Sequence, residues 1–316
     1  MLHSHDLFQR ILIAPHGRDA DELHIVSGYA TSMMARRHFV ECHGLKISLI
    51  VGMCPRDGLS MSNHRGFVGL ANQMEGDFTC MYNTGIATHS KLYVWYSNGH
   101  PTEAYAGSAN YTQQAFIQHV QNEIICDCDP FEADDYYRSL LPLSLPCTLP
   151  VIGDRIRLLN RLPSTRQAQQ ETEGVNDDIV VPAGLRRVEL PLVDRNGNVP
   201  SRSGLNWGQR EGRDPSQAYL SVPAPIAQSG FFPPRTVHFN VLTDDGQTME
   251  LSVAQDGGKA LHSPNDNSII GHYFRRRLGL RDGEYVTRAH LDAYGRTTVT
   301  MLKDDDENYY LDFSVR

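Results

Sequence analysis

The sequence predicts two domains of different fold class, an α/β domain followed by an all-β domain. The chain has 316 residues, which suits two domains of ordinary size. In the first half, apolar runs typical of strands alternate with stretches that have helical character. In the second half, short strand-like runs alternate with turn residues. We therefore expect a first domain at 1–155, a linker at 156–183 and a second domain at 184–316.

The first domain is expected to be built around buried strands. The near-continuous apolar run at 46–53 is typical of a central strand. Thr31 or Ser32 can cap a helix that stops before Gly44. The Asn98-Gly99 pair is a strong hairpin signal between two strands. The expected strands are 23–30, 46–53, 77–82, 91–96, 103–107 and 123–128, and the expected helices are 31–43, 66–74 and 131–141.

The second domain is expected to be a small β-barrel or sandwich. Three prolines in the stretch 142–150, followed by a polar stretch without periodicity at 161–178, separate it from the first domain. Turn residues at 244–246 and 293–295 fall between its apolar runs. The expected strands are 187–192, 218–222, 236–242, 248–253, 297–302 and 309–315, with one helix at 267–278.

The net charge is distributed unevenly between the two domains. The formal net charge of −8 argues at first against a nucleic-acid partner. However, residues 1–155 hold 10 cations and 16 anions, whereas residues 156–316 hold 19 and 21. Of the 29 cations, 25 are Arg, a side chain suited to bidentate binding of phosphates and guanine edges. A GC-rich genome is the alternative explanation for the arginines, and both stay open.

Cysteine usage and hydropathy suggest a cytoplasmic protein. The six cysteines form no Cys-x-x-Cys pair, and the N-terminal segment lacks the pattern of a secretory signal. The longest apolar runs, such as 47–51, are far shorter than the roughly 20 residues that a membrane span needs. We therefore expect reduced thiols and no membrane partner.

One group of residues in the first domain suits phosphodiester cleavage without a metal. His89 and Lys91 would point to the same face of a strand, about 6.6 Å apart. Ser108 and Asn110 follow the next strand, where they can donate hydrogen bonds to an anion. A nitrogen of His89 can attack phosphorus, while Lys91 and Asn110 hold its oxygens. A carboxylate such as Glu123 can take the other ring N–H, although a surface carboxylate is the alternative.

The motif His-x-Lys at 89–91, followed by Gly-Ser-x-Asn at 107–110 and Glu123, resembles the signature of the phospholipase D superfamily. Members carry two such motifs, in one chain or by pairing two chains, and this sequence has one His-x-Lys. The resemblance therefore implies a homodimer through the N-terminal domain with one composite site. One copy of His89 would form a covalent phosphohistidine, and the other would act as general acid. Tyr96 stands where phospholipases carry Asp, which puts a lipid substrate in doubt.

Two stretches of the second domain have side chains suited to DNA. Arg reads guanine, Asn and Gln read adenine, and all of them bind phosphates. These types gather at 199–213 and 255–267, and the second stretch leads into Arg275–Arg277. The alternatives are a structural loop with Trp207 in the core and a solvated helix face for the three arginines. The candidate DNA-binding residues are Arg202, Ser203, Asn206, Trp207, Gln209, Arg210, Arg213, Lys259, Asn265 and Asn267.

The second half also resembles the C-terminal DNA-binding domain of NgoFVII-type restriction endonucleases. The likeness includes the stretches 199–213, 244–246, 254–260 and 276–297. That domain is similar to the B-three pseudobarrel of plant transcription factors, whose two arms enter the major groove. The resemblance implies a phospholipase-D-like α/β domain followed by a B-three-like domain. It also implies a type II-like restriction endonuclease that acts on double-stranded DNA and cleaves without a cofactor. Some members work with a helicase-like ATPase, so ATP dependence would arise only through a partner subunit.

Three alternative functions remain open. A phosphodiesterase acting on lipids or other small phosphodiesters would have a second domain that does not bind DNA. A DNA-binding regulator with a silent catalytic half would not need the intact set of His89, Lys91, Asn110 and Glu123. A non-catalytic scaffold would leave that pattern unexplained. His119 is expected on a helix surface and outside the catalytic group.

Overall fold

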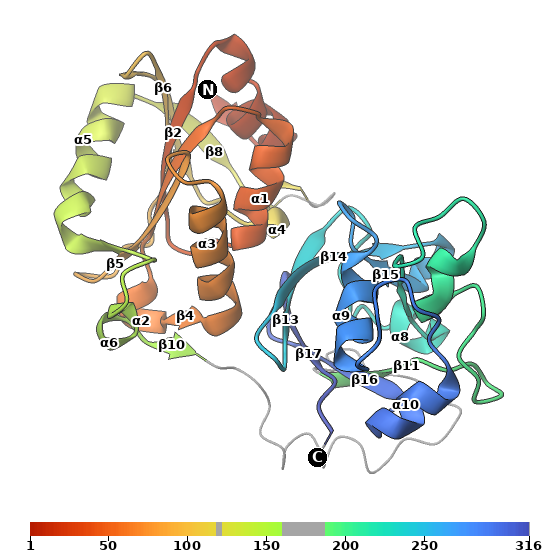
Figure 1. Ribbon diagram of the computed structural model, residues 1–316. Helices are drawn as coiled ribbons and strands as arrows, with labels where there is room; N and C mark the ends of the chain where they lie inside the picture. Colours follow the sequence, from red (N-terminus) through yellow and green to blue (C-terminus); the bar gives the residue numbers. More distant parts are fainter. Residues whose placement is uncertain (118–121, 160–186, 316) are drawn as a thin grey trace. The chain divides into compact units, whose positions relative to one another are not determined.

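The computed structural model describes residues 1–117, 122–159 and 187–315. The chain divides into two compact units, Met1–Asn160 and Arg161–Arg316 (Figure 1). Most of the expected linker, together with His119, lies outside the described residues. No helix in the described ranges is long and apolar enough to cross a membrane.

The first unit is built on an eight-stranded sheet with the order β1-β8-β7-β6-β2-β3-β5-β9. Its strands are β1 (Leu2–His3), β2 (Glu22–Ser27), β3 (Lys46–Val51), β5 (Phe78–Asn83), β6 (Lys91–Ser97), β7 (His100–Gly107), β8 (Ile125–Cys128) and β9 (Ser144–Pro146). Its helices are α1 (Ser32–Glu41), α2 (Cys54–Asp57), α3 (Met61–Gln73), α4 (Gln113–Phe116), α5 (Pro130–Leu140) and α6 (Ile152–Arg155), with a π-helix, η1 (Phe8–Ile13), and two 3-10 helices, η2 (His16–Arg18) and η3 (Leu141–Leu143). A separate parallel pair joins β4 (Leu59–Ser60) and β10 (Leu158–Leu159).

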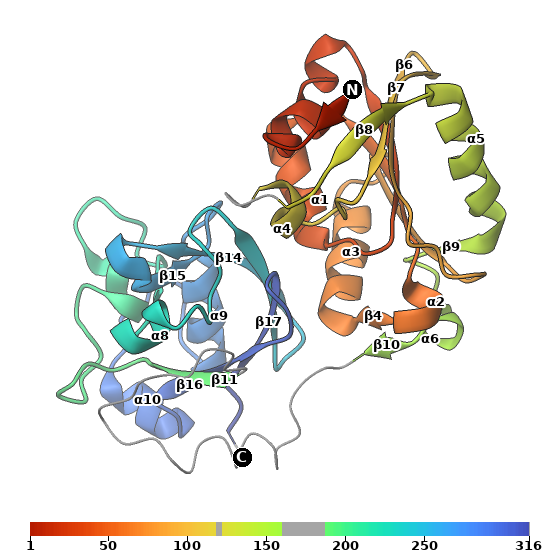
Figure 2. The same cartoon turned by 180° about the vertical axis from the view of Figure 1, so that it is seen from behind.

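The two faces of this sheet are covered by different helices. Helices α1 and α3 lie on one face and α5 on the other, as Figures 1 and 2 show from opposite sides. Strand β6 serves both layers because alternate side chains point to opposite faces. Tyr93 and Trp95 are buried in the larger core, whereas Leu92 and Val94 are buried in the core beneath α5. Local signals hold as expected: the Thr31 side chain caps α1 by accepting from Met34 N at 3.3 Å.

The strand directions gather several chain segments at one edge of the sheet. Strands β2, β3 and β5 are parallel and end at the same edge. Strand β6 runs antiparallel to β2 and begins there, with Lys91 opposite Ser27. Strand β7 ends there and β8 begins there, because each pairs antiparallel with its neighbour. Residues placed at these ends therefore come together although they are far apart in sequence.

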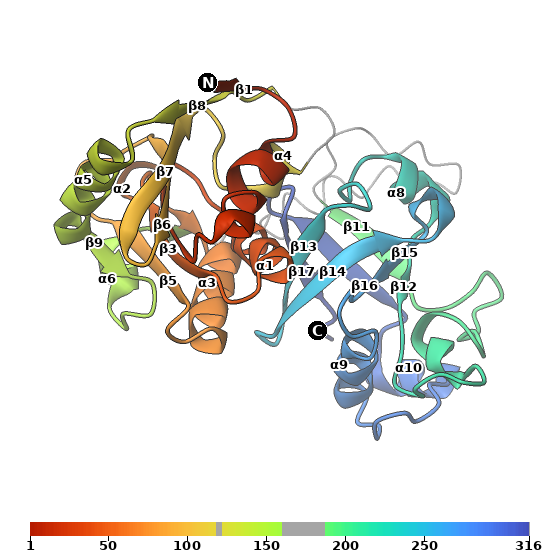
Figure 3. The same ribbon diagram turned by 90° about the horizontal axis from the view of Figure 1, so that it is seen from above.

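The second unit is a seven-stranded, nearly closed barrel with the order β11-β16-β17-β13-β14-β15-β12, whose two end strands lie in contact (Figure 3). Its strands are β11 (Arg187–Pro191), β12 (Leu220–Ser221), β13 (His238–Thr243), β14 (Thr248–Ala254), β15 (Ala260–His262), β16 (Thr298–Lys303) and β17 (Asn308–Asp312). Its helices are α8 (Ala224–Gln228), α9 (Ile269–Arg277) and α10 (Arg288–Tyr294), with turns η4 (Gly204–Gln209) and η5 (Asp256–Gly258).

Several elements of the barrel differ from the sequence-based expectation, among them α8, β15 and α10. Strand β15 has three residues and interrupts the stretch 255–267, which was expected to form one continuous arm. It pairs with β14 and β12, so Lys259 precedes the strand and Asn265 follows it. Helix α10 begins with a capping box between Thr287 and His290, a pair that departs from the usual Ser or Thr with Glu or Gln. The short length of β15 and the unusual cap of α10 explain why the sequence did not predict these two elements.

Candidate functional site

His89 lies two residues before β6, at the sheet edge where β2 and β3 end, and its side chain is exposed. It packs closely on Gly28, because a Cβ on that glycine would lie 2.8 Å from Cδ2 of His89 and 3.3 Å from its Cα. The ring of Tyr29 stands edge-on to the imidazole, with centroids 5.6 Å apart. The imidazole is therefore held by neighbours and still accessible to a substrate.

Lys91 opens β6 and is almost fully buried, with 7% of its surface exposed. Its Nζ donates to the carbonyl oxygen of His89 at 2.6 Å. Burial lowers the pKa of the Lys91 ammonium, and the Glu123 carboxylate opposes that shift. Within the described part of the chain, the ammonium makes no other hydrogen bond, so it can donate to a bound anion.

Asn110 follows the end of β7 and reaches across to the residues that follow β2. Its Oδ1 accepts from the backbone N of Tyr29 at 3.1 Å. Ser27 strengthens the same junction, because its Oγ donates to Tyr29 O at 2.5 Å and accepts from Tyr111 N at 2.9 Å. With its oxygen already used, the Asn110 side chain has its Nδ2 left to donate to an anion.

Glu123 is held by Ser108. The Ser108 hydroxyl donates to the Glu123 carboxylate and accepts from Ile124 N at 3.0 Å. Gly107 permits this close approach of the chain segments, since a Cβ there would lie 2.1 Å from Ile124 O. Within residues 1–117 and 122–159, no hydrogen bond joins Glu123 to the His89 ring, so the expected contact is not formed in a single chain.

The sheet edge therefore brings together the five residues predicted from sequence, in two groups. His89, Lys91 and Asn110 surround the residues that follow β2, and Ser108 pairs with Glu123 beside them. An accessible imidazole beside a buried ammonium and an amide can attack and hold a phosphodiester. Across the described residues, no group of three or more His, Cys, Asp or Glu side chains is placed to hold a metal ion.

In the second unit, two predicted DNA-binding side chains are used internally. Asn206 is fully buried, and its amide both donates to Val286 O at 2.8 Å and accepts from Val286 N at 2.9 Å. The Gln209 amide donates to Gly283 O at 2.9 Å and to Pro215 O at 3.2 Å. These side chains fasten the 199–213 segment to the barrel.

The arginines of the same segment are exposed. Arg213 stacks over the half-buried Trp207 ring, 3.9 Å from its centroid, and donates to Gln217 Oε1 at 3.0 Å. Arg210 donates through Nε to the carbonyl oxygen of Arg202 at 2.7 Å. Their remaining N–H groups can reach a phosphate or a base edge. Ser203, which follows Arg202 in the sequence, is half-buried.

The predicted residues around β15 are spread over both ends of that strand. Lys259 is exposed just before it. Beyond it, Asn265 donates to Glu250 Oε2 at 3.1 Å, and Asn267 Oδ1 contacts His262 Nδ1 at 3.1 Å. The three side chains therefore do not belong to one continuous surface loop.

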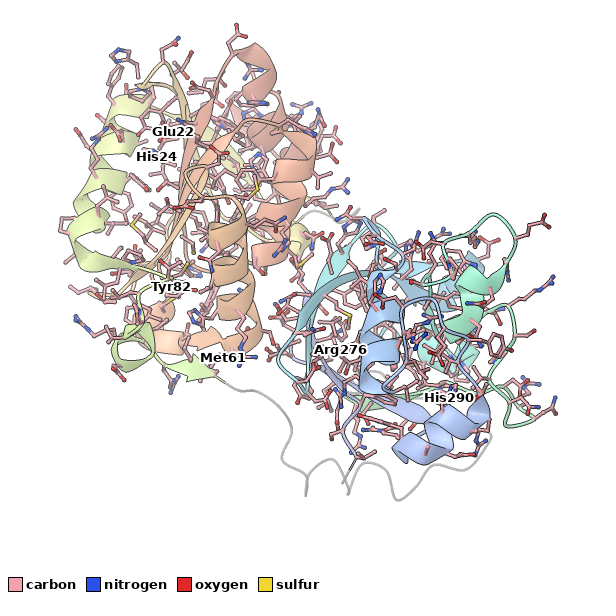
Figure 4. All side chains as sticks on the ribbon, in the orientation of Figure 1. Glu22, His24, Met61, Tyr82, Arg276 and His290 are labelled. Carbon is pink, nitrogen blue, oxygen red and sulfur yellow. The ribbon has the colours of Figure 1, made fainter. Side chains whose placement is uncertain are left out.

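The basic cluster on α9 is committed to contacts within the barrel. Arg275 is fully buried, and its guanidinium donates to the carbonyl oxygens of Leu205, Pro215, Ser216 and Glu284. Arg277 binds both carboxylate oxygens of Asp244, at 2.6 and 2.7 Å, and Arg276, labelled in Figure 4, pairs with Asp245. The hydrogen bonds that Arg277 donates to the Asp244 carboxylate are the main cause of the raised pKa of Arg277. From the sequence, the stretch 244–246 was expected only to form a turn. The two adjacent acidic residues at 244–245 were the one signal in the sequence for these ion pairs.

Comparisons with known proteins match both units to parts of one kind of enzyme. Residues 5–153 match the family model for the NgoFVII restriction endonuclease N-terminal PLD domain. Residues 181–305 match the model for the NgoFVII C-terminal B3-like DNA-binding domain. The two matches together span most of the chain.

Three solved structures are also similar to parts of the chain. NucT from Helicobacter pylori has 16% identity over 46% of this chain and 97% of that chain, with a TM-score of 0.33. A hypothetical Arabidopsis thaliana protein has 15% identity over 42% and 91%, with a TM-score of 0.22. Polyphosphate kinase from Porphyromonas gingivalis has 14% identity over 45% and 21%, with a TM-score of 0.30. No curated protein matches the chain.

Proposed function

Because this chain belongs to the NgoFVII restriction endonuclease family, with a PLD domain followed by a B3-like DNA-binding domain, we propose that it cuts double-stranded DNA at a short recognised sequence. The observation that carries this proposal is the sheet edge of the first unit. There an exposed imidazole lies beside a nearly buried ammonium and an oriented amide. The family membership makes DNA the substrate that best fits this chemistry.

The proposed reaction proceeds through a covalent phosphohistidine. A neutral His89 nitrogen attacks phosphorus and forms an N–P bond, while the P–O bond to the leaving oxygen breaks. Lys91 and Asn110 donate to the non-bridging oxygens as negative charge develops on them. A second histidine protonates the leaving oxygen, and then takes a proton from the water that hydrolyses the N–P bond. The step needs neither a metal nor another cofactor.

We propose that the second histidine is His89 of another copy. The sequence has one His-x-Lys motif, so one chain supplies one nucleophile of this kind. A homodimer through the first domain would place the two histidines on opposite sides of one scissile phosphate. A single composite site would then cut the two DNA strands in turn. If a helicase-like ATPase takes part, ATP would act only through that partner.

DNA recognition is proposed for the exposed cations of the barrel. Arg202, Arg210 and Arg213 are exposed on the segment 199–213, and Lys259 is exposed before β15. Arg can bind guanine O6 and N7 in a bidentate manner, and all four can bind phosphates. In contrast, the buried Asn206 would maintain the shape of the segment.

Replacing His89 tests the proposal directly. We expect His89→Ala to abolish cleavage of plasmid DNA in EDTA, while a gel shift still detects DNA binding. The exposed His43 lies elsewhere in the fold, so His43→Ala is the matched control and should cleave normally. Cleavage lost on chelation in the wild type, or retained by His89→Ala, would contradict the phosphohistidine mechanism. Cleavage of a small phosphodiester without any DNA binding would support the alternative phosphodiesterase.

A further inference from the structure

The two residues that flank His89 share a hydrogen-bonded partner on another element. The Tyr136 hydroxyl, from α5, lies 2.9 Å from Thr88 Oγ1 and 2.6 Å from Ser90 Oγ. The Thr88 and Ser90 hydroxyls are themselves 3.1 Å apart. Three hydroxyl groups therefore form a closed triangle around the backbone that carries His89.

This triangle lies on the α5 face of the sheet. Side chains alternate along an extended chain, so Ser90 is in phase with Leu92 and Val94. Both of those residues are buried in the core beneath α5. His89 is in phase with Lys91 and points to the other face. Tyr136 therefore holds the segment 88–90 by hydrogen bonds on the α5 face of the sheet. The His89 imidazole, on the opposite face, stays unobstructed by Tyr136.

The segment needs such a support because His89 precedes the first residue of β6. Strand pairing therefore does not hold His89 itself. On the β3 side, Thr88 N donates to Gly52 O at 3.1 Å. The approach is close, since a Cβ on Gly52 would lie 2.2 Å from Thr88 O. The backbone before His89 is thus fixed by Gly52 on one side and by Tyr136 on the other.

We propose that Tyr136 is a positioning residue for the His89 nucleophile. This inference rests on the proposed function of His89. Attack on phosphorus requires the reacting atoms to be aligned, and a misplacement of about 1 Å can cost on the order of a hundredfold in rate. Tyr136 touches neither the imidazole nor the oxyanion donors in the described contacts, so it acts through the backbone of Thr88 and Ser90.

The next residue along α5 provides a matched control. Tyr137 is buried, with 2% of its surface exposed, and its hydroxyl bonds to Ser48 Oγ at 2.7 Å. Tyr136 is 39% exposed. Each Tyr→Phe change removes one hydroxyl from the same helix. Only the change at Tyr136 removes the hydrogen bonds to Thr88 and Ser90, the residues on either side of His89.

The experiment measures single-turnover cleavage, DNA affinity and thermal unfolding of the full chain. For Tyr136→Phe we expect the cleavage rate to fall about tenfold, with the DNA Kd within twofold of wild type and the same melting temperature. For Tyr137→Phe we expect an unchanged rate and a lower melting temperature. Ser90→Ala should slow cleavage similarly, and the double variant with Tyr136→Phe should be no slower than either single variant.

Several outcomes would overturn the inference. A Tyr136→Phe rate within twofold of wild type would do so, as would equal rate losses in Tyr136→Phe and Tyr137→Phe. Additive effects of Tyr136→Phe and Ser90→Ala would also contradict a shared triangle. Failure of the proposed function is distinguishable, because the wild type would then not cleave DNA, or His89→Ala would still cleave it, whatever Tyr136→Phe does.

Discussion

The two regions that the sequence singled out for function differ in whether their predicted polar side chains face solvent or the protein interior. At the sheet edge of the first unit, His89 is exposed beside Lys91 and Asn110, and the predicted residues lie together. In the barrel, Asn206 and Arg275 are fully buried and bond to the protein's own backbone. The first region was recognised by spacing on strands, and the second mainly by residue type. Residue type does not reveal whether a polar side chain faces solvent or the interior.

The largest effect is expected at Lys91, where activity and stability should separate. Burial lowers the pKa of the Lys91 ammonium, so the charged form destabilises the fold there. We expect Lys91→Met to slow single-turnover cleavage by about 10²–10³-fold, because a donor to the developing charge is lost. The free energy of unfolding, measured with denaturant, should not fall. Cleavage close to the wild-type rate would remove Lys91 from the reaction.

In the barrel, Arg275 should behave in the opposite way. Its guanidinium satisfies four carbonyl groups in the interior. Because each buried acceptor left unsatisfied costs about 1–3 kcal/mol, we expect Arg275→Met to lower the free energy of unfolding by at least about 3 kcal/mol. Arg202→Met, at an exposed position, is the control and should unfold like the wild type. Weakened DNA binding with unchanged stability in Arg275→Met would show that the arginine reaches DNA.

A pair of alanine variants would sharpen the contrast within one segment. Asn206→Ala leaves Val286 unpaired in the core and should lower the free energy of unfolding by about 1–3 kcal/mol. Arg202→Ala should preserve stability and weaken specific DNA binding by about 1–3 kcal/mol if it reads a guanine. Denaturant unfolding and a gel shift with cognate DNA measure the two quantities. If both variants lose the same quantity, the division between internal and DNA-facing residues is wrong.

The smallest effect is expected at Arg213. Its stacking on Trp207 holds the guanidinium in one orientation, and a lysine would keep the charge without the stack. We expect Arg213→Lys to weaken DNA binding by about 0.5–1 kcal/mol. A binding titration at two salt concentrations checks this, since the number of neutralised phosphates and hence the salt dependence should stay the same. An unchanged DNA affinity in Arg213→Lys would mean that Arg213 acts through charge alone.

The fold was largely predictable because long periodic segments determine it. The buried run that became β3, the Asn98-Gly99 hairpin and the Thr31 cap all lie where the sequence places them. The pair β15 and α10 was missed because one is too short for a pattern and the other has an unusual cap. The matched family models agree with the predicted combination of a PLD domain and a B3-like domain.

The candidate site was predictable only where its residues share local spacing. His89 with Lys91 and Ser108 with Asn110 sit two residues apart, so strand geometry could relate them. Tyr136 was not found, because its link to the His89 segment depends on how α5 packs on the sheet. The hydrogen bond that Glu123 receives from Ser108 instead of His89 was hidden for the same reason. Contacts between distant segments leave no periodic signal in one sequence.

Three glycines at the sheet edge have a consequence for mutational tolerance. Added Cβ atoms would meet His89 at Gly28, Thr88 at Gly52 and Ile124 at Gly107, within 2.8, 2.2 and 2.1 Å. Two of these obstacles are backbone atoms, which cannot rotate away. A saturation scan selecting for DNA cleavage would therefore reject every other residue type at these positions. The scan would therefore outline the site through three positions at which the absence of a side chain is itself the requirement.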